Sequence, residues 1–325
     1  MKKNIAILMG GNSSEVEISV QSGNQIFDNI DRNKYNPYKV LLKGKDWLVS
    51  NELIDNVPIN KNNFSIILQN QEINFDCVFI IIHGTPGEDG KLQGYFDLLD
   101  IPYTTSGVLT SALTFDKFAC KNFLNAFNIL SPKSILISKS ENISPKYLTE
   151  IFDFPFIIKP NNGGSSFGIS IVNSFEEITL ALQKAFSEDT ELIIEEYIAG
   201  IELTCGLFKT KKGKIILPIT EIVSKNAFFD YEAKYTPEMA DEIIPARISN
   251  NIKEKCEKIS SLIYDNLNCK GVVRIDYILK DNNLYFLEVN TIPGMSKNSI
   301  VPRQAKAHGI SLEELVSILI ENSFI

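Results

Sequence analysis

Two neighbouring strand sequences near the C-terminus carry acidic side chains whose spacing suits metal binding. Residues 272–277 and 284–290 both read as β-strands, and the Asp-Asn-Asn at 281–283 between them is typical of a turn. A three-residue loop predicts an antiparallel hairpin in which Asp276 lies opposite Glu288. Like charges in such positions repel each other, so the pattern indicates that a positive charge offsets them.

The same face of the predicted hairpin also carries Arg274 and Asn290, because side chains two residues apart on a strand point the same way. Asp276, Glu288 and Asn290 together offer two carboxylates and an amide oxygen. These are hard oxygen ligands of the kind that Mg²⁺ prefers, with room left for water and phosphate oxygens. The sequence therefore predicts a magnesium site here, although a solvated hairpin face with one Arg–Asp ion pair explains the pattern about equally well.

A second chemical feature is the segment 156–168, with the sequence FIIKPNNGGSSFG. Its apolar residues predict a buried strand that leads Lys159 into a loop of glycines and serines, whose small side chains let backbone N–H groups approach phosphate oxygens. The lysine precedes the loop, so the segment is neither the G-x-x-x-x-G-K-[ST] phosphate loop nor G-x-G-x-x-G. A flexible surface hairpin is the alternative interpretation.

Two segments between these features have weaker signals. Residues 192–198 predict a strand that ends in Glu195 and Glu196 and is followed by Glu202. Carboxylates in these positions are able to accept hydrogen bonds from an adenine amino group and from ribose hydroxyls, although strand ends more often carry solvated charges. Residues 228–235 are aromatic and charged in a loop region, which is typical of a lid or of a packed surface loop.

The first part of the chain predicts an α/β layer with a largely parallel sheet. The strand at 5–9 ends at Gly10-Gly11, and a helix follows in which Ser14 and Glu17 form a capping box. A second strand at 75–82 ends in the same way at His83-Gly84. Open α/β folds place ligands at this carboxyl edge of the sheet, so His83 is a candidate ligand-binding residue, although a lone buried histidine is more often structural.

The rest of the chain predicts two further units. A helix at about 110–128 leads to Ser131-Pro132, where a second unit begins. A third unit starts at about residue 201. The remaining predicted elements are strands at 156–159, 169–172, 192–196, 203–208 and 215–223, and helices at about 175–186 and 251–266.

Composition excludes several classes of protein. The chain has 325 residues, 44% of them hydrophobic, which predicts two or three ordinary globular domains. A net charge of −8 without a basic block argues against nucleic acid as the main partner. Apolar runs are too short for a membrane span. Five separated cysteines predict reduced thiols in a cytoplasm, and two histidines are too few for a multi-histidine metal site. No G-x-S-x-G elbow of a serine hydrolase is present.

Taken together, these segments resemble the D-alanine:D-alanine ligase family of the ATP-grasp enzymes, along nearly the whole chain. The matching residues are Leu8-Met9-Gly10-Gly11 with Glu15 and Ser19, His83-Gly84, residues 87–90, Gln93-Gly94, Tyr103, Ser106-Gly107, Ser111-Ala112, Asp116-Lys117, Lys159-Pro160, residues 164–166, Gly168, residues 231–235, Gly271, residues 274–276, Glu288, Asn290-Thr291, residues 293–295 and Ser299. The resemblance implies a three-domain ATP-grasp architecture, with an N-terminal α/β substrate-binding domain (1–115), a central ATP-grasp subdomain (116–200) and a C-terminal α+β subdomain (201–325).

The resemblance also implies roles for individual residues. The nucleotide would contact Lys117, Lys159, Glu195, Glu196, Ile198, Glu202 and Lys234. Two Mg²⁺ or Mn²⁺ ions would be held by Asp276, Glu288 and Asn290. Substrate binding and catalysis would use Glu15, His83, Ser165, Tyr235, Arg274, Gly294 and Ser299. Glu196 and Phe229 depart from the family pattern, in which a lysine and a tyrosine are common at these positions.

The implied reaction joins two D-alanines through an acyl phosphate formed from ATP, for peptidoglycan precursors. A D-alanine:D-lactate or D-alanine:D-serine ligase is the nearest alternative, and Tyr235 favours the D-alanine product because relatives of the other kind usually lack it. A non-catalytic ATP-binding module is a further alternative. The resemblance also implies a cytoplasmic homodimer.

Overall fold

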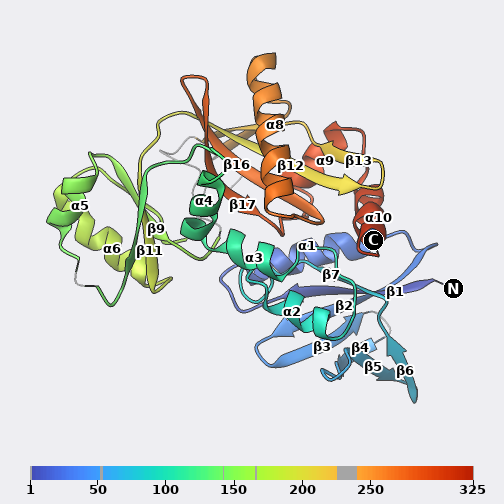
Figure 1. Ribbon diagram of the computed structural model, residues 1–325. Helices are drawn as coiled ribbons and strands as arrows, with labels where there is room; N and C mark the ends of the chain where they lie inside the picture. The colour runs from blue at the N-terminus through green and yellow to red at the C-terminus, as the bar shows by residue number, and fades with distance from the viewer. Residues whose placement is uncertain (1, 52–53, 142, 165–166, 225–239, 325) are drawn as a thin grey trace.

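The computed structural model describes residues 2–51, 54–141, 143–164, 167–224 and 240–324. Three larger β-sheets follow one another along the chain, and each lies in a separate part of the molecule (Figure 1). The strands of these sheets lie within residues 3–80, 134–196 and 201–290. This order agrees with the three predicted units, and we keep their boundaries at 116 and 201 as a proposal.

The N-terminal sheet has the strand order β4-β3-β2-β1-β7. Its strands are β1 (Lys3–Gly10), β2 (Tyr35–Lys43), β3 (Asp46–Asn51), β4 (Ile54–Pro58) and β7 (Cys77–Ile80), and a small hairpin of β5 (Ser65–Leu68) and β6 (Gln71–Asn74) adjoins it. Strand β1 pairs in parallel with β2 and β7, as expected. The β2–β3 and β3–β4 pairs are antiparallel, so the sheet is mixed, because a tight turn at Gly44 joins β2 directly to β3.

Helices of the first domain are α1 (Val16–Asn29), α2 (Lys91–Leu98) and α3 (Val108–Phe115). The expected capping box does not form. The N-cap of α1 is Glu15, whose side chain makes no capping hydrogen bond, and Ser14 is exposed. The helix begins one residue later than the pattern indicates, which leaves the Glu15 carboxylate available for other contacts.

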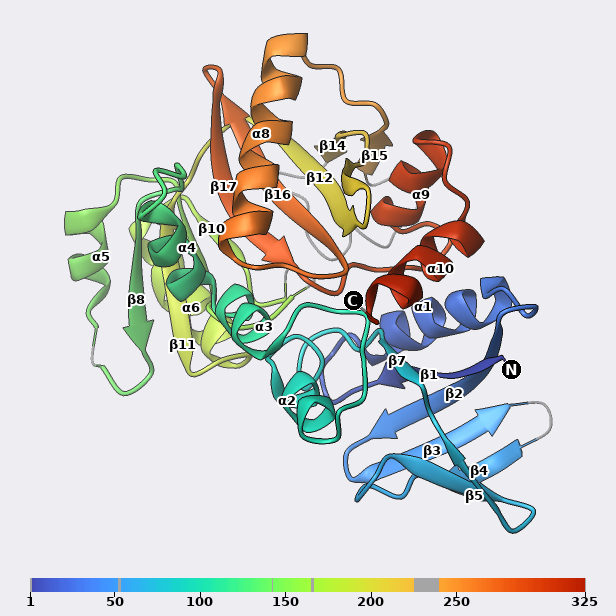
Figure 2. The same cartoon turned by 45° about the vertical axis from the view of Figure 1, so that its right-hand side comes forward.

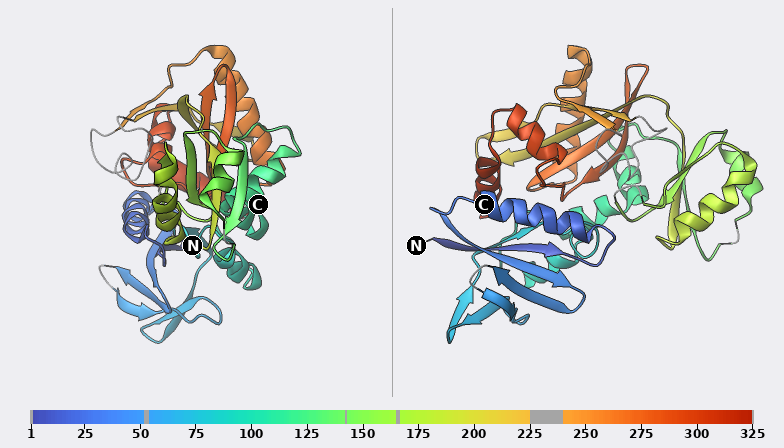
Figure 3. Two further views of the ribbon diagram at one scale, coloured as in Figure 1. Left: turned by 90° about the vertical axis from the view of Figure 1, so that its left-hand side faces the viewer. Right: turned by 180° about the vertical axis from the view of Figure 1, so that it is seen from behind.

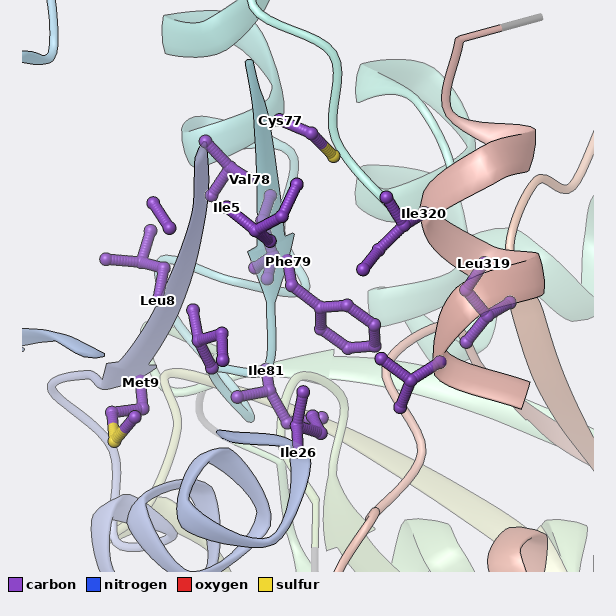
Figure 4. Close-up of a cluster of buried hydrophobic side chains, with 14 of the residues drawn as sticks. Ile5, Leu8, Met9, Ile26, Cys77, Val78, Phe79, Ile81, Leu319 and Ile320 are labelled. Atoms are coloured by element: carbon purple, nitrogen blue, oxygen red, sulfur yellow. The ribbon is translucent and has the colours of Figure 1, made fainter. Parts of the chain in front are cut away.

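The core of the first domain includes the end of the chain. Side chains of β1, β7 and α1 pack with Leu319 and Ile320 of α10 (Leu312–Asn322), as Figure 4 shows. The C-terminal helix α10 therefore lies against α1 (Figure 3). Because this core joins the first and last segments of the chain, it fixes the N-terminal sheet relative to the C-terminal one.

The central sheet has the strand order β10-β9-β11-β8 and is antiparallel throughout. Its elements are β8 (Ser134–Ser138), α5 (Pro145–Ile151), β9 (Phe156–Pro160), β10 (Ser170–Val172), α6 (Ile178–Phe186) with the preceding 3-10 turn Phe175–Glu177, and β11 (Glu191–Glu196). Its apolar face packs on α5 and α6 in a core of its own. Lys159 is placed by β9 and Glu195 by β11.

The C-terminal sheet has the strand order β15-β14-β12-β16-β17, with β13 paired to β12. Its elements are β12 (Ile201–Thr210), β13 (Gly213–Ile216), β14 (Thr220–Ser224), β15 (Ala240–Ile243), α8 (Asn250–Asn266), β16 (Val272–Lys280), β17 (Asn283–Asn290) and α9 (Ile300–Ala307). Helix α8 packs on this sheet in a second core (Figure 2). The single strand expected at 215–223 is two strands, β13 and β14, which pair with opposite ends of β12.

The helix expected at 110–128 is two helices, α3 and α4 (Lys117–Asn125). Asp116 between them has an extended backbone, and its side chain accepts a hydrogen bond from the Ala119 backbone N–H as the N-cap of α4. Helix α4 contacts both β8 and β17, and lies between the central and C-terminal sheets (Figures 1 and 2). The interruption of the helix at Asp116 directs the Lys117 side chain toward the space between these sheets. No helix in the described part of the chain is long and apolar enough to cross a membrane.

Candidate active site

The β16–β17 hairpin pairs Asp276 with Glu288 and Arg274 with Asn290, as expected. The loop is different from the prediction. Lys280 pairs with Asn283, so the turn has two residues, Asp281 and Asn282, which both adopt positive φ as a type I′ turn requires. A β-bulge at Leu287, opposite the step from Asp276 to Tyr277, then restores the predicted pairs.

The four polar side chains of this hairpin form one connected group. Arg274 donates to both carboxylate oxygens of Asp276, with Nε–Oδ1 at 2.9 Å and a terminal nitrogen to Oδ2 at 2.7 Å. The Asn290 amide nitrogen lies 3.1 Å from Asp276 Oδ2 and 3.5 Å from Glu288 Oε1. The Lys117 ammonium lies 3.5 Å from Glu288 Oε2. In the structure, two cations and an amide offset the apposed carboxylates.

This donor set fits a divalent cation. Asp276 and Glu288 meet at one point of the sheet, and a flip of the Asn290 amide would present its oxygen to the same point in place of its nitrogen. Carboxylate and amide oxygens are ligands that Mg²⁺ accepts. Among the described residues there is no cluster of three or more His, Cys, Asp or Glu side chains placed to hold a metal, so the hairpin trio is the candidate.

The two predicted phosphate-binding lysines occupy the two sides of the glycine-rich loop. Lys117, at the start of α4, donates to the Gly163 carbonyl at 2.5 Å and also approaches Glu288. Lys159, at the end of β9, lies 2.7 Å from Glu195 Oε2. Both side chains are largely buried. The loop start 161–164 therefore lies close to two ammonium groups, which suits the binding of phosphate oxygens by the loop backbone.

Glu195 lies between two ammonium groups. Its Oε2 contacts Lys159, and its Oε1 forms an ion pair with Lys121. Burial alone would raise the pKa of the Glu195 carboxyl, but the two lysines hold it below its usual value, so the group is ionised. Sequence reasoning identified Glu195 and Lys159 but missed Lys121. The missed signal is its spacing, because Lys121 is four residues after Lys117 and shares its face of α4.

The other predicted nucleotide residues follow Glu195 at the edge of the central sheet. The Glu196 carboxylate accepts a hydrogen bond from the Lys133 backbone N–H at 2.7 Å, which turns it toward the start of β8. Ile198 lies in the link between β11 and β12, and Glu202 lies at the start of β12. Glu195 and Glu196 are thus the last residues of β11, and Ile198 and Glu202 lie within and directly after its link to β12.

The N-terminal domain brings Glu15 to the same loop. Both carboxylate oxygens of Glu15 lie over Gly164, where a Cβ atom would meet them at 2.8 and 3.0 Å, so a side chain at 164 would collide with Glu15. Glu15 itself is 7% exposed. The structure thus brings a buried carboxylate of the first domain to the glycine-rich loop of the central one, at Gly164.

His83 is buried close to Glu15. Burial lowers the pKa of its imidazole, and Glu15 opposes that effect, so the ring is neutral at pH 7. Its Nε2 atom has no hydrogen-bond partner among the described residues. An unpaired buried nitrogen is costly unless a ligand satisfies it, which supports a substrate-binding role for His83.

Glu88 is a second residue that sequence reasoning did not single out as functional. Its Oε2 accepts a hydrogen bond from the Gly84 backbone N–H at 2.8 Å. Burial raises the pKa of this carboxyl to about 8, with the nearby Glu15 adding to the effect and the Gly84 bond opposing it. Glu88 is therefore largely protonated at neutral pH and adds little negative charge to this side of the site.

The protonation of Glu88 predicts a pH dependence of stability. The folded-state pKa of Glu88 is about 8, above the ordinary value of 4.5. The contribution of Glu88 to the free energy of unfolding is therefore complete below pH 4.5, decreases above that pH, and is lost once the pH has risen through 8. Glu88→Gln stays neutral at every pH. Between about pH 5.5 and pH 8 the metal-free variant should therefore lose roughly 3 kcal/mol less stability than the unsubstituted protein. Urea unfolding at both pH values checks this, and parallel losses in the two proteins would contradict it.

Ser299 and Gly294 lie where the chain leaves the hairpin and enters α9. Ser299 Oγ is 2.8 Å from Ser296 Oγ and accepts from the Ser296 backbone N–H. A Cβ atom on Gly294 would lie 2.8 Å from Ser299 Oγ, so the two residues are in direct contact. The predicted oxyanion donor and the predicted carboxylate-binding hydroxyl are thus neighbours.

Comparisons with known proteins agree with this geometry. The family model described as "D-ala D-ala ligase N-terminus" matches residues 4–106, and "D-ala D-ala ligase C-terminus" matches residues 124–321. A D-alanine–D-alanine ligase of Azobacteroides pseudotrichonymphae is 48% identical over 322 residues, which is 98% of this chain and 99% of the relative. The relative in Bacteroides fragilis is 44% identical over the full length of both chains.

The chain belongs to the D-alanine–D-alanine ligase family.

Solved structures of this family have the same fold. The VanG D-Ala:D-Ser ligase of Enterococcus faecalis has a TM-score of 0.88 at 32% identity, covering 99% of this chain and 100% of that one. The Bacillus anthracis D-alanine–D-alanine ligase complexed with ATP has a TM-score of 0.80 at 33% identity, covering 99% of this chain and 97% of that one.

Three predicted site residues of the ligase fall outside the described part of the chain. Ser165 belongs to the glycine-rich loop, and Lys234 and Tyr235 belong to segment 225–239, together with the departing residue Phe229. Their roles stay predictions. The described flanks of that segment, β14 and β15, pair with each other in the C-terminal sheet.

Proposed function

We propose that the protein joins two molecules of D-alanine into D-alanyl-D-alanine, with ATP activating the first as an acyl phosphate. The observation that carries this proposal is the position of Lys117. Its ammonium contacts both the Gly163 carbonyl of the glycine-rich loop and the Glu288 carboxylate of the metal-binding hairpin. A phosphate chain that displaced either contact would lie between the loop and the metal ligands.

The chemistry of the reaction explains this choice of residues. A carboxylate is a poor acyl donor, because its leaving group would be oxide. Transfer of the γ-phosphoryl group of ATP to a carboxylate oxygen of D-alanine gives an acyl phosphate and ADP. Such a transfer depends mainly on positioning and on neutralising charge, which Lys117 and Lys159 supply, rather than on a protein nucleophile.

The hairpin would hold two Mg²⁺ or Mn²⁺ ions through Asp276, Glu288 and Asn290. When bound, these ions neutralise charge on the transferring phosphate oxygens. Glu195 to Ile198 and Glu202 would line the adenine and ribose, with the Glu195 carboxylate accepting from the adenine amino group.

The amino acids would bind between Glu15, His83 and the segment 294–299. Glu15 would hold the ammonium of the first D-alanine, and Ser299 the carboxylate of the second. The amine of the second D-alanine attacks the acyl phosphate carbonyl, and phosphate leaves from the tetrahedral intermediate. Arg274 and the Gly294 backbone N–H would face the oxyanion that develops there.

A ligase that accepts D-serine as the second substrate is the second candidate. It is considered because the VanG D-Ala:D-Ser ligase has a TM-score of 0.88, the same value as the D-alanyl-alanine synthetase A of Vibrio cholerae. The two candidates differ only in the second substrate, so a competition assay separates them.

The competition assay supplies MgATP with D-alanine alone, and with D-alanine plus equal D-serine or D-lactate. We expect D-alanyl-D-alanine as the main product in every mixture, with one phosphate released per dipeptide. Mass spectrometry of the products and a phosphate assay check this. A main product containing D-serine or D-lactate would overturn the substrate assignment, and no ATP-dependent product would overturn the ligase assignment.

We also propose that the protein acts in the cytoplasm as a homodimer. The five cysteines are unpaired and buried, which suits a reducing compartment. Helices α2 and α3 expose Leu98 at 86% and Leu109 at 78%, a small apolar surface for a second copy. Light scattering should give twice the monomer mass, and a monomer at micromolar concentration would contradict the dimer.

A further inference from the structure

In the proposed nucleotide site, the two lysines next to Glu195 carry more positive charge than the Glu195 carboxylate neutralises. Lys121 and Lys159 both bind Glu195, one on each oxygen, and Glu195 is 1% exposed. The three side chains together therefore carry a net charge of +1 in a region that water hardly reaches. Such an excess is costly unless an anion completes the site.

The two lysines are anchored differently. Lys121 lies on the second turn of α4, between Cys120 and Leu124, which both belong to the core under the C-terminal sheet. Its side chain is 3% exposed. Lys159 ends strand β9 directly before the glycine-rich loop, and its side chain is 9% exposed. Lys121 is thus held in the interior, whereas Lys159 is next to the loop where phosphates are proposed to bind.

We propose that Lys121 is a positioning residue for nucleotide binding. Lys121 stays paired with Glu195 as its permanent counter-ion, and this allows Lys159 to leave the Glu195 carboxylate and bind the phosphates. The inference rests on the proposed roles of Lys159 and Glu195 in the nucleotide site. It gives a function to a lysine that touches neither phosphate nor metal.

The physical reason is the cost of leaving Glu195 unpaired. If Lys159 were its only partner, transfer of Lys159 to a phosphate would strand a buried carboxylate, which costs several kcal/mol in a protein interior. When Lys121 is present, Lys159 exchanges the Glu195 carboxylate for a phosphate, and Glu195 keeps Lys121 as its partner. The free energy of the buried carboxylate then changes little when ATP binds.

Helix α4 also explains how Lys121 is held next to Lys117. Like charges at positions i and i+4 of a helix repel each other. Here each lysine meets a carboxylate from a different sheet, Glu288 for Lys117 and Glu195 for Lys121. Lys117 contacts the described part of the glycine-rich loop at Gly163, and Lys159 directly precedes the loop. We therefore expect the phosphates to bind these two lysines, with Lys121 unchanged.

The test compares Lys121→Met with the double variant Lys121→Met/Glu195→Gln. Methionine keeps the length of the stem without the charge. In the single variant Lys159 is the only partner of Glu195, so the KM for ATP should rise at least tenfold, with kcat and the KM for D-alanine changed less than threefold. In the double variant the carboxylate charge is gone and Lys159 is released, so the KM for ATP should fall about threefold or more below that of the single variant. It should stay above its original value, because Glu195→Gln also alters the proposed contact with the adenine.

Two variants serve as controls. Lys214→Met removes another lysine that is paired with a carboxylate, Asp265, outside the site, and should leave all kinetic constants unchanged. Lys159→Met removes a proposed phosphate ligand and should raise the KM for ATP beyond the effect of Lys121→Met. If Lys159→Met leaves the KM for ATP unchanged, the proposed nucleotide site is wrong. If Lys159→Met raises the KM for ATP but Lys121→Met does not, only the inference on Lys121 is refuted.

The inference is overturned by an unchanged KM for ATP in Lys121→Met, or by a double variant that is as impaired as the single one. The second result would assign Lys121 a structural role only. Should Lys121→Met fail to fold, the double variant still decides, because it contains no stranded charge. An ATP affinity in the double variant as low as that of Lys159→Met would then refute the inference.

Discussion

Glu288→Gln should lower kcat by about a hundredfold or more while the protein stays folded. Glu288 is one of two carboxylates proposed to hold the metal ions, and loss of about 3 kcal/mol of charge stabilisation in the transition state corresponds to a hundredfold in rate. The fold should survive, because Glu288 lies at the partly exposed edge of the hairpin, and Lys117 keeps its hydrogen bond to the Gly163 carbonyl. Steady-state kinetics at saturating ATP and D-alanine, with Mg²⁺ varied, measure the effect.

The matched control for this variant is Asp265→Asn, which removes a carboxylate paired with Lys214 outside the site. It should leave kcat unchanged. Asp276 is a poorer choice for this test, because Arg274 donates two hydrogen bonds to it and would lose its partner. Full turnover by Glu288→Gln at ordinary Mg²⁺ concentration would show that the hairpin is not the metal site.

Glu15→Gln should raise the KM for D-alanine by about 10- to 100-fold and leave the KM for ATP unchanged. A hydrogen bond between charged groups contributes about 1.5–3 kcal/mol, and the amide keeps the shape of the side chain but not its charge. Glu15 approaches the described part of the glycine-rich loop at Gly164, whereas the proposed phosphate ligand Lys117 contacts it at Gly163, so we expect nucleotide binding to be independent of the Glu15 charge. Initial rates with each substrate varied in turn separate the two constants.

Glu17→Gln is the control, since Glu17 is exposed in the first turn of the same helix α1. It should behave as the unsubstituted protein. Unaltered D-alanine kinetics in Glu15→Gln would refute the assignment of Glu15 to the substrate ammonium, and a parallel rise in the KM for ATP would point to a structural effect on the loop.

The β16–β17 hairpin shows what sequence reasoning could predict and what it could not. Alternation of apolar and polar residues predicted which strands form and which residues face each other, and the pairs Asp276–Glu288 and Arg274–Asn290 are correct. The loop length was wrong. Turn and bulge each shift the register by one residue, and the two shifts cancel at Asp276. A bulge depends on packing between sheets, so local sequence does not specify it.

Contacts between domains were the least predictable part of the site. Lys121 looked like an ordinary helix lysine, because its partner Glu195 is 74 residues away on another sheet. Glu88 lies in a turn that suggests solvent, yet it is partly buried, and its carboxylate accepts from the Gly84 backbone N–H and lies near Glu15. By contrast, the resemblance predicted that Lys117, Lys159 and Glu15 lie in one site, and the structure places all three next to the glycine-rich loop, while their roles stay predictions.

The break at Asp116 has a similar explanation. The apolar periodicity of residues 110–128 continues through it, and so predicts one helix. In the structure Asp116 caps α4 and forms an isolated bridge with Asn162. The glycine-rich loop thus determines where the helix starts, and that start determines the direction of Lys117.

The central claim is that a D-alanine carboxylate is activated as an acyl phosphate in this site. The most direct measurement uses D-alanine with both carboxylate oxygens labelled with ¹⁸O, together with MgATP. The account predicts one ¹⁸O atom in each phosphate released, in equal amount to the dipeptide formed, because the attacking carboxylate oxygen leaves with the phosphoryl group. Dipeptide formed with unlabelled phosphate would contradict it.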